Sequence, residues 1–285
     1  MNSSMIINLN NSSKKLFNLG FVKLVDCMPR VIPEPVKKLK CDSAIVESAR
    51  VSFGDTFKDY DTDKKLIKYL FRNKHTSPFE MVKFKFHIKA PIFVQRQWIR
   101  HRTANVNEIS GRYSEMKEAM YIPEELRSQD KINKQGSKFT FIPRPAVVED
   151  YTNSLVDNIR TYENYKKLVN HGVSRELARI FLPLNLYTEF YWCIDLHNLL
   201  NFIKLRESPE AQYEIREYAK AVKELASEFC PITFECYEEY TSNSIQLSSK
   251  EQQLINEKNF SQDNFESTSE YHAFIKKVNK LNIKS

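Results

Sequence analysis

The residues with the clearest chemical potential form a short basic run followed by a polar segment. Arg100-His101-Arg102 places a guanidinium group on either side of an imidazole. A guanidinium suits phosphate because its planar fork donates two parallel, charge-assisted hydrogen bonds. The next dozen residues add donors, a carboxylate and an aromatic ring: Asn107, Glu108, Ser110, Arg112, Tyr113 and Ser114. A polar loop after a cationic helix predicts a site for a nucleotide, although an exposed basic face is the simpler alternative for Arg-His-Arg alone.

A second group of polar side chains lies in the stretch from 195 to 206. His197 and Asn201 are four residues apart, so on a helix they share one face. Arg206 falls in the last turn of that helix. A cation there interacts favourably with the helix dipole, which stabilises the helix by less than about 1 kcal/mol. The opposite face can form an apolar stripe of Leu196, Leu199, Leu200 and Ile203. The pattern predicts a helix that presents polar groups to a ligand or to solvent.

Charge and glycine content narrow the kinds of ligand and the means of holding them. The chain of 285 residues carries a net charge of +7, and the segment 82–112 alone contains seven Lys or Arg residues against one acid, Glu108. A basic surplus favours acidic partners such as nucleotides or nucleic acid. The five glycines are widely separated. This spacing excludes the two Gly-rich phosphate-binding loops, the Walker type and the dinucleotide-binding type, because each needs clustered glycines. Side chains must therefore hold any bound phosphate.

Cysteine content and the apolar pattern bear on the compartment. The five cysteines are odd in number and form no Cys-x-x-Cys pair. A disulfide framework or a cysteine-based zinc site is therefore not expected, and a reducing compartment is favoured. Neither a signal peptide nor an apolar run of membrane-spanning length occurs. The sequence predicts a cytoplasmic protein without a metal.

Apolar periodicity predicts the elements that position these side chains. Alternation predicts a half-buried strand over 82–90, with His87 on its polar, exposed side. Further strands are expected over 20–25 and 186–194, and a loop over 103–114. Helices are expected over 41–50, 62–73, 92–102, 147–170, 175–182, 196–206, 209–229 and 266–283. Strands scattered among many helices predict an α+β fold, with helices around a small, mostly antiparallel sheet, rather than a doubly wound sheet.

Composition divides the chain into three parts. Residues 1–20 are rich in Asn, Ser and Lys and are expected to be flexible. Residues 21–244 form the predicted catalytic domain. Residues 245–285 form a hydrophilic, partly helical tail.

Several stretches of the sequence resemble one enzyme family, in the same order along the chain. Arg100-His101-Arg102, seven further residues and Ser110 match the signature of the flavin-dependent thymidylate synthases (ThyX). The similarity extends from about residue 20 to about residue 240. The flanking stretches that also resemble this family are DSAIVESARVS, HTSPFE, APIFVQRQW, RELARIFL and NFIKLRESPEAQYEIR.

The resemblance implies a specific reaction and assembly. Enzymes of this family convert dUMP to dTMP, with methylenetetrahydrofolate as the carbon donor, NADPH as the reductant and bound FAD as the hydride carrier. They are typically homotetramers in which subunits share each active site. The family pattern implies that Arg206 is the activating residue, because a guanidinium beside the uracil ring stabilises the negative charge that makes C5 nucleophilic.

The family pattern also implies which positions hold each ligand. The residues that would bind dUMP are Gln97, Trp98, Ile99, Arg100, Glu108, Ile109, Ser110, Gly111, Arg112, Arg179 and Arg206. The residues that would contact FAD are Ser77, Arg100, His101, Arg102, Glu108, Asp195, Leu196, His197 and Asn201. Ser110 has no base next to it in the sequence, so binding rather than nucleophilic attack is expected of it.

The sequence departs from the family pattern at two positions. Met81 follows Glu80 where many relatives carry His, and Glu210 stands where a His is common. Both departures concern the flavin contacts and leave the nucleotide motif intact. The resemblance gives the cysteines no catalytic role.

Two other functions compete with the enzyme. The basic stretch from Lys83 to Arg112 could bind nucleic acid, but no helix-turn-helix or zinc pattern accompanies the charge. A relative that binds nucleotide without turnover is the other alternative, and the intact Arg100, Ser110, Arg112 and Arg206 argue against it.

Overall fold

The structure is a computed structural model, and it describes residues 4–10, 12–54, 57–130, 136–139 and 142–283. The chain divides into two compact units, Met1–Cys236 and Tyr237–Ser285. No helix within the described ranges has the length and apolar character needed to cross a bilayer.

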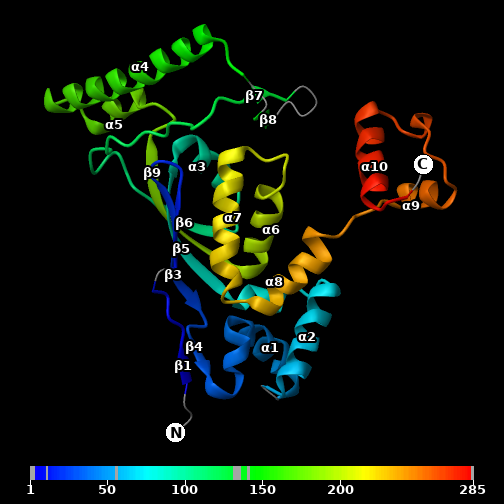
Figure 1. Cartoon of the computed structure of the whole chain (residues 1–285). Helices are drawn as coiled ribbons and strands as arrows, with labels where there is room; N and C mark the ends of the chain where they lie inside the picture. The colour runs from blue at the N-terminus through cyan, green and yellow to red at the C-terminus, as the bar shows by residue number, and fades with distance from the viewer. Residues whose placement is uncertain (1–3, 11, 55–56, 131–135, 140–141, 284–285) are drawn as a thin grey trace. The chain divides into compact units, whose positions relative to one another are not determined.

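A five-stranded antiparallel sheet forms the centre of the first unit (Figure 1). Its strand order is β2-β3-β5-β9-β6, so the alternating strand expected over 82–90 lies in the middle. The strands are β2 (Ser13–Leu16), β3 (Gly20–Met28), β5 (Lys83–Pro91), β6 (Ala104–Glu108) and β9 (Tyr187–Asp195). Two further antiparallel pairs join β1 (Ser4–Ile6) with β4 (Val31–Pro33) and β7 (Ser128–Gln129) with β8 (Ser137–Lys138).

Helices make up most of the remaining described chain, and the expected α+β fold is confirmed. The α-helices are α1 (Ser43–Arg50), α2 (Tyr60–Arg72), α3 (Ile92–Trp98), α4 (Pro145–Asn170), α5 (Arg175–Ala178), α6 (Leu196–Arg206), α7 (Tyr213–Ser227), α8 (Pro231–Tyr237), α9 (Ser249–Asn256) and α10 (Thr268–Lys280). Short 3-10 helices are η1 (Glu34–Asp42), η2 (Val51–Phe53), η3 (Ser77–Met81), η4 (Arg179–Phe181) and η6 (Gln262–Asn264), and η5 (Glu238–Ser242) is a π-helix.

One face of the sheet is buried under helices. The apolar positions of β5, Phe84, Phe86 and Ile88, are fully buried, and α3, α6 and α7 pack on this side. Figure 1 shows α6 and α7 side by side next to the strands. Trp98 of α3 packs against Trp192 of β9, with ring centroids 5.2 Å apart, and against Phe202 of α6, at 4.8 Å. This aromatic cluster fixes α3 and α6 relative to the sheet, because large rings dominate the energy of burial.

Two local predictions around the basic run are wrong. The helix expected over 92–102 ends at Trp98, and the amide of His101 bonds to the carbonyl of Trp98 in a tight final turn. A longer helix would also stack Arg96 on Arg100 with like charges four residues apart. The loop expected over 103–114 begins with β6, because this polar segment gains backbone hydrogen bonds along the edge of β9.

The structure also differs from the sequence-based expectation at His87, and it contains strands near the N-terminus. The ring of His87 is half-buried, stacks on Tyr191 at 4.7 Å and lies 3.3 Å from a carboxylate oxygen of Glu189. Strands β1 and β2 lie within the first 20 residues, the part of the chain whose composition predicts flexibility. A hairpin with β3 supplies the backbone pairing for β2. Residues 1–3 and 11 lie outside the described residues.

The second unit is a small helical body with its own core. Leu254 of α9 packs with Phe274 and Val278 of α10. Lys277 donates to both carboxylate oxygens of Glu251, at 2.7 and 2.8 Å, which ties the two helices together. These contacts give the expected hydrophilic tail an ordered, helical structure over its described part.

A buried carboxylate links η1 to α8 in the first unit and predicts a pH-dependent stability. Asp42 is fully buried and accepts hydrogen bonds from the amide of Ile232 (2.8 Å) and from the hydroxyl of Thr233 (2.6 Å). Burial raises the pKa of Asp42 to about 7, against the opposing effect of these hydrogen bonds. The folded state therefore holds a proton that the unfolded chain releases above about pH 4.

We expect the wild type to lose stability relative to Asp42→Asn as the pH rises from about 4 to about 8. The neutral amide can keep the contacts, since the Thr233 hydroxyl can also accept. At about 1.4 kcal/mol per pKa unit, the difference amounts to a few kcal/mol. Urea denaturation of both proteins at several pH values measures it, and parallel pH profiles would contradict the prediction.

Candidate active site

Helix α6 carries Arg206 to the edge of a pocket. The helix begins directly after β9, and the carboxylate of Asp195 caps it by accepting from the amide of Asn198 at 2.9 Å. The expected apolar stripe is confirmed, because its four residues are all buried: Leu196, Leu199, Leu200 and Ile203. With that face packed, Arg206 at the last turn is only half-buried.

Two hydrogen bonds hold the guanidinium of Arg206 in one orientation. Its Nε donates to Nε2 of His101 at 2.9 Å, and its Nη2 donates to the backbone oxygen of Gln97 at 3.3 Å. Burial lowers the pKa of Arg206 from its usual value, but a guanidinium stays charged at neutral pH. The site thus contains a fixed cation whose remaining N–H groups are available to a ligand.

The partner of this cation is a neutral imidazole. Burial, and then the charge of Arg206, lower the pKa of His101 to about 4. The ring also packs edge-on against Phe202, with centroids 4.9 Å apart. Because Nε2 accepts from Arg206, the ring proton lies on Nδ1. His101 therefore orients the guanidinium without neutralising it.

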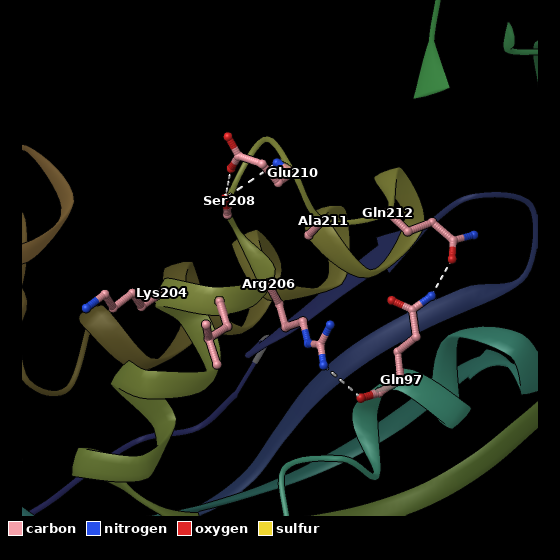
Figure 2. A pocket seen from close by; sticks show the side chains of 8 residues that line it. Gln97, Lys204, Arg206, Ser208, Glu210, Ala211 and Gln212 are labelled. Atoms are coloured by element: carbon pink, nitrogen blue, oxygen red, sulfur yellow. Dashed lines mark hydrogen bonds between the residues drawn. The ribbon is translucent and has the colours of Figure 1, made fainter. Parts of the chain in front are cut away.

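The pocket beside Arg206 has a volume of about 510 Å³ and is formed by α6, the turn after it and the end of α3 (Figure 2). Gln97 donates its side-chain amide to the side-chain oxygen of Gln212 across the pocket. Ser208 donates to Glu210 on the opposite wall. The lining residues are Gln97, Lys204, Leu205, Arg206, Ser208, Glu210, Ala211 and Gln212. Of the positions expected to bind dUMP, this pocket brings together Gln97 and Arg206.

A second group of expected dUMP residues gathers where the segment after β6 packs on α5 and η4. A Cβ atom added to Gly111 would lie 3.2 Å from Cδ of Arg179, which shows how closely the two segments approach. Arg112 is paired with Glu176, with Nε and Oε2 3.6 Å apart. The hydroxyl of Ser110 accepts from the amide of Arg112 at 3.3 Å. This group does not line the pocket at Arg206.

The other expected dUMP residues contribute in different ways. Glu108 accepts from Gln95 at 2.9 Å and from Thr188 at 2.6 Å, so both carboxylate oxygens have partners. Trp98 is 1% exposed in the aromatic core, and only its backbone can reach a ligand. Ile99 is exposed, and Ile109 packs against the core cluster around Met116.

The expected FAD positions lie around the start of α6. Asp195 and Leu196 are buried, whereas His197 and Asn201 are more accessible. Nδ2 of Asn201 lies 3.3 Å from Nε2 of His197. Helix η3, which begins at Ser77, packs against α6.

Two cations stand at the exposed end of the basic run. The side chains of Arg100 and Arg102 are exposed, and neither forms an ion pair with a described residue. Free guanidinium groups of this kind fit the diphosphate of a dinucleotide, as expected for a chain without Gly-rich phosphate loops.

The sequence patterns do not identify two polar residues at the pocket wall. Gln212 and Glu214 lie at the start of α7 and connect to Gln97 through hydrogen bonds. Their stretch shows only a resemblance to the family pattern. A Glu in the first helical turn signals only a favourable helix dipole, so nothing local indicated that its carboxylate is buried.

Comparisons with known proteins identify a matching family model, similar sequences and a similar solved structure. A family model described as "Thymidylate synthase complementing protein" matches residues 36–232. A flavin-dependent thymidylate synthase from Thermus thermophilus is 51% identical over 234 residues, covering 81% of this chain and 80% of the relative. One from Dictyostelium discoideum is 45% identical over 244 residues, covering 85% and 78%. The crystal structure of the UMP/dUMP methylase PolB from Streptomyces cacaoi, bound with 5-Br dUMP, has a TM-score of 0.67 at 29% identity and covers 80% of this chain and 98% of that one.

Proposed function

The chain belongs to the family of flavin-dependent thymidylate synthases, and from this premise we propose that dUMP is methylated in the pocket beside Arg206. The chain is a methyltransferase that converts dUMP to dTMP and depends on a flavin. The observation that carries the assignment of the pocket is the fixed, cationic guanidinium at its edge. Binding of nucleic acid, or of nucleotide without turnover, is not favoured.

Arg206 acts by electrostatics in this proposal. Uracil becomes nucleophilic at C5 as negative charge develops on its ring, and a preorganised guanidinium stabilises that charge. Arg206 itself is no base, because its proton is held too tightly. His101 and the carbonyl of Gln97 hold the guanidinium in place before the substrate arrives, so little reorganisation is needed during the reaction.

The flavin is proposed to be FAD, held by side chains. Arg100 and Arg102 are exposed, have no ion-pair partner among the described residues and fit its phosphates. The accessible His197 and Asn201 lie on the α6 face expected to contact it. When bound, FAD supplies the reducing equivalent that turns the transferred carbon into a methyl group. We propose methylenetetrahydrofolate as the carbon source, NADPH as the reductant and the cytoplasm as the compartment.

Shared sites in a homotetramer explain the second group of dUMP residues. Ser110, Gly111, Arg112 and Arg179 gather away from the pocket at Arg206 within one chain. Next to them, α5, η4 and the following turn expose large apolar side chains: Leu177, Ile180, Phe181 and Leu184 are each more than half exposed. We propose that another subunit covers this apolar surface and that each complete site combines residues from two chains.

FAD binding should therefore require assembly. Phe181→Asp places a charge on the apolar surface and is expected to release flavin together with dissociation of the tetramer. Size-exclusion chromatography with light scattering and flavin absorbance measures both. Phe53→Asp, at a side chain that is 81% exposed on η2, is the control and should change neither. A stable monomer that keeps its full flavin content would contradict shared sites.

Omission of each component tests the reaction. The purified, flavin-loaded protein should form dTMP from dUMP only when methylenetetrahydrofolate and NADPH are both present, and leaving out either should stop turnover. Formation of dTMP without methylenetetrahydrofolate would contradict the proposed carbon source, and formation without NADPH would contradict the proposed reductant.

A further inference from the structure

A hydrogen-bond relay runs from a buried carboxylate to Gln97 in the wall of the pocket. Glu214, in the first turn of α7, is 1% exposed. Its Oε1 accepts from the hydroxyl of Tyr121 at 2.9 Å and from Arg127, and its Oε2 accepts from Nε2 of Gln212 at 2.9 Å. The side-chain oxygen of Gln212 in turn accepts from Nε2 of Gln97. Arg127 thus supplies the opposite charge that a buried carboxylate needs.

The carboxylate at the start of this relay fixes the direction of every amide in it. An ionised carboxylate can only accept hydrogen bonds, so Gln212 must turn its NH₂ group toward Glu214. The oxygen of Gln212 then faces Gln97, and only the NH₂ group of Gln97 can donate to it. The remaining side-chain oxygen of Gln97 points away from Gln212, on the side of the pocket where Arg206 lies (Figure 2).

That oxygen is available to a ligand. Among the described residues, none donates a hydrogen bond to the side-chain oxygen of Gln97. An acceptor at the pocket edge complements the guanidinium of Arg206, which offers only donors. Together they match a ligand edge that carries a donor beside an acceptor.

We propose that Glu214 is a positioning residue for the nucleotide: through Gln212 it holds Gln97 with its carbonyl oxygen toward the pocket, where it accepts a hydrogen bond from dUMP. This inference rests on the proposed binding of dUMP at Arg206. The donors of dUMP are the ring N3–H and the 3′-hydroxyl, whereas its ionised phosphate only accepts. The contact of Gln97 therefore falls on the nucleoside part of the substrate.

Three variants of the full-length, flavin-loaded enzyme test the relay. Gln212→Met removes the link while keeping Glu214 and Arg127 paired, and Glu214→Gln removes the acceptor-only group. Each is expected to raise KM for dUMP, and its dissociation constant by calorimetry, about five- to tenfold, the loss typical of one oriented hydrogen bond. The kcat should stay within about twofold, and the double variant should be no worse than Gln212→Met alone.

Tyr121→Phe is the matched control, because the Tyr121 hydroxyl bonds to Oε1 and leaves the Oε2 contact with Gln212 intact. It should leave KM for dUMP unchanged. A wild-type KM in Gln212→Met overturns the inference, even where Glu214→Gln fails to fold. A KM in Tyr121→Phe raised as far as in Gln212→Met overturns it as well, since the effect would then be one of general packing. If the variants give either of these results while the wild type forms dTMP, the proposed function still stands. If the wild type fails to bind dUMP, the inference and the proposed function are both overturned.

Discussion

Arg206→Lys is expected to lower the rate of dTMP formation by about a hundredfold or more while the protein stays folded and loaded with flavin. Nε and Nη2 of Arg206 hold His101 and the carbonyl of Gln97, and the rest of the planar fork faces the pocket. One ammonium cannot make both fixed contacts and also present a second donor edge to uracil. Reduction of the flavin by NADPH should survive better than methyl transfer, because the role proposed for Arg206 is on the nucleotide and not in hydride uptake from NADPH.

The alternative for Arg206 is a charge at a helix end, worth at most about 1 kcal/mol, which Lys would replace well. Arg72→Lys, at the exposed end of α2, is the matched control and should change neither activity nor Tm. The assay uses saturating dUMP and methylenetetrahydrofolate, with Tm and flavin content measured in parallel. Near-normal dTMP formation by Arg206→Lys would contradict its catalytic assignment.

Arg102→Ala is expected to lower flavin occupancy at least tenfold with the fold intact. The side chain is exposed and has no ion-pair partner among the described residues, so its loss costs little stability. If it binds a phosphate of FAD, its removal takes away a charge-assisted hydrogen bond to the cofactor. Flavin absorbance per chain measures occupancy, and circular dichroism measures the fold.

The control for this variant is Arg96→Ala, which removes an exposed guanidinium from α3 a few residues earlier and should leave flavin occupancy unchanged. A nucleic-acid surface gives the opposite pattern. In that case Arg102→Ala keeps its flavin and instead reduces the salt dependence of DNA or RNA binding by about one unit of slope. That outcome would contradict the assignment to FAD.

Sequence patterns predicted those elements in which apolar residues recur at the spacing of a strand or a helix. The alternation over 82–90 identified β5, and the apolar stripe of α6 identified both the helix and the turn that bears Arg206. Both patterns arise because burial of one face is imposed along the whole element. The α+β class followed from the order of such elements.

Features that depend on distant partners could not be predicted in this way. The segment of β6 is polar and becomes a strand only because β9 offers its edge. His87 stands on the polar side of β5, yet the neighbouring Tyr191 and Glu189 half-bury it. The same limit applies at the site, where the buried carboxylate of Glu214 accepts hydrogen bonds from the distant Arg127 and Tyr121. The preference of a residue for a helix or a strand does not indicate which distant residues will pack against it.

The measurement that tests the central claim most directly follows the carbon atom itself. The flavin-loaded protein is incubated with dUMP, NADPH and methylenetetrahydrofolate labelled with ¹³C in its methylene group, and the nucleotides are analysed by mass spectrometry. We expect dTMP with the label in its methyl group, formed by the wild type and reduced about a hundredfold or more in Arg206→Lys. Absence of labelled dTMP from flavin-loaded wild-type protein would contradict the claim that this chain methylates dUMP at Arg206.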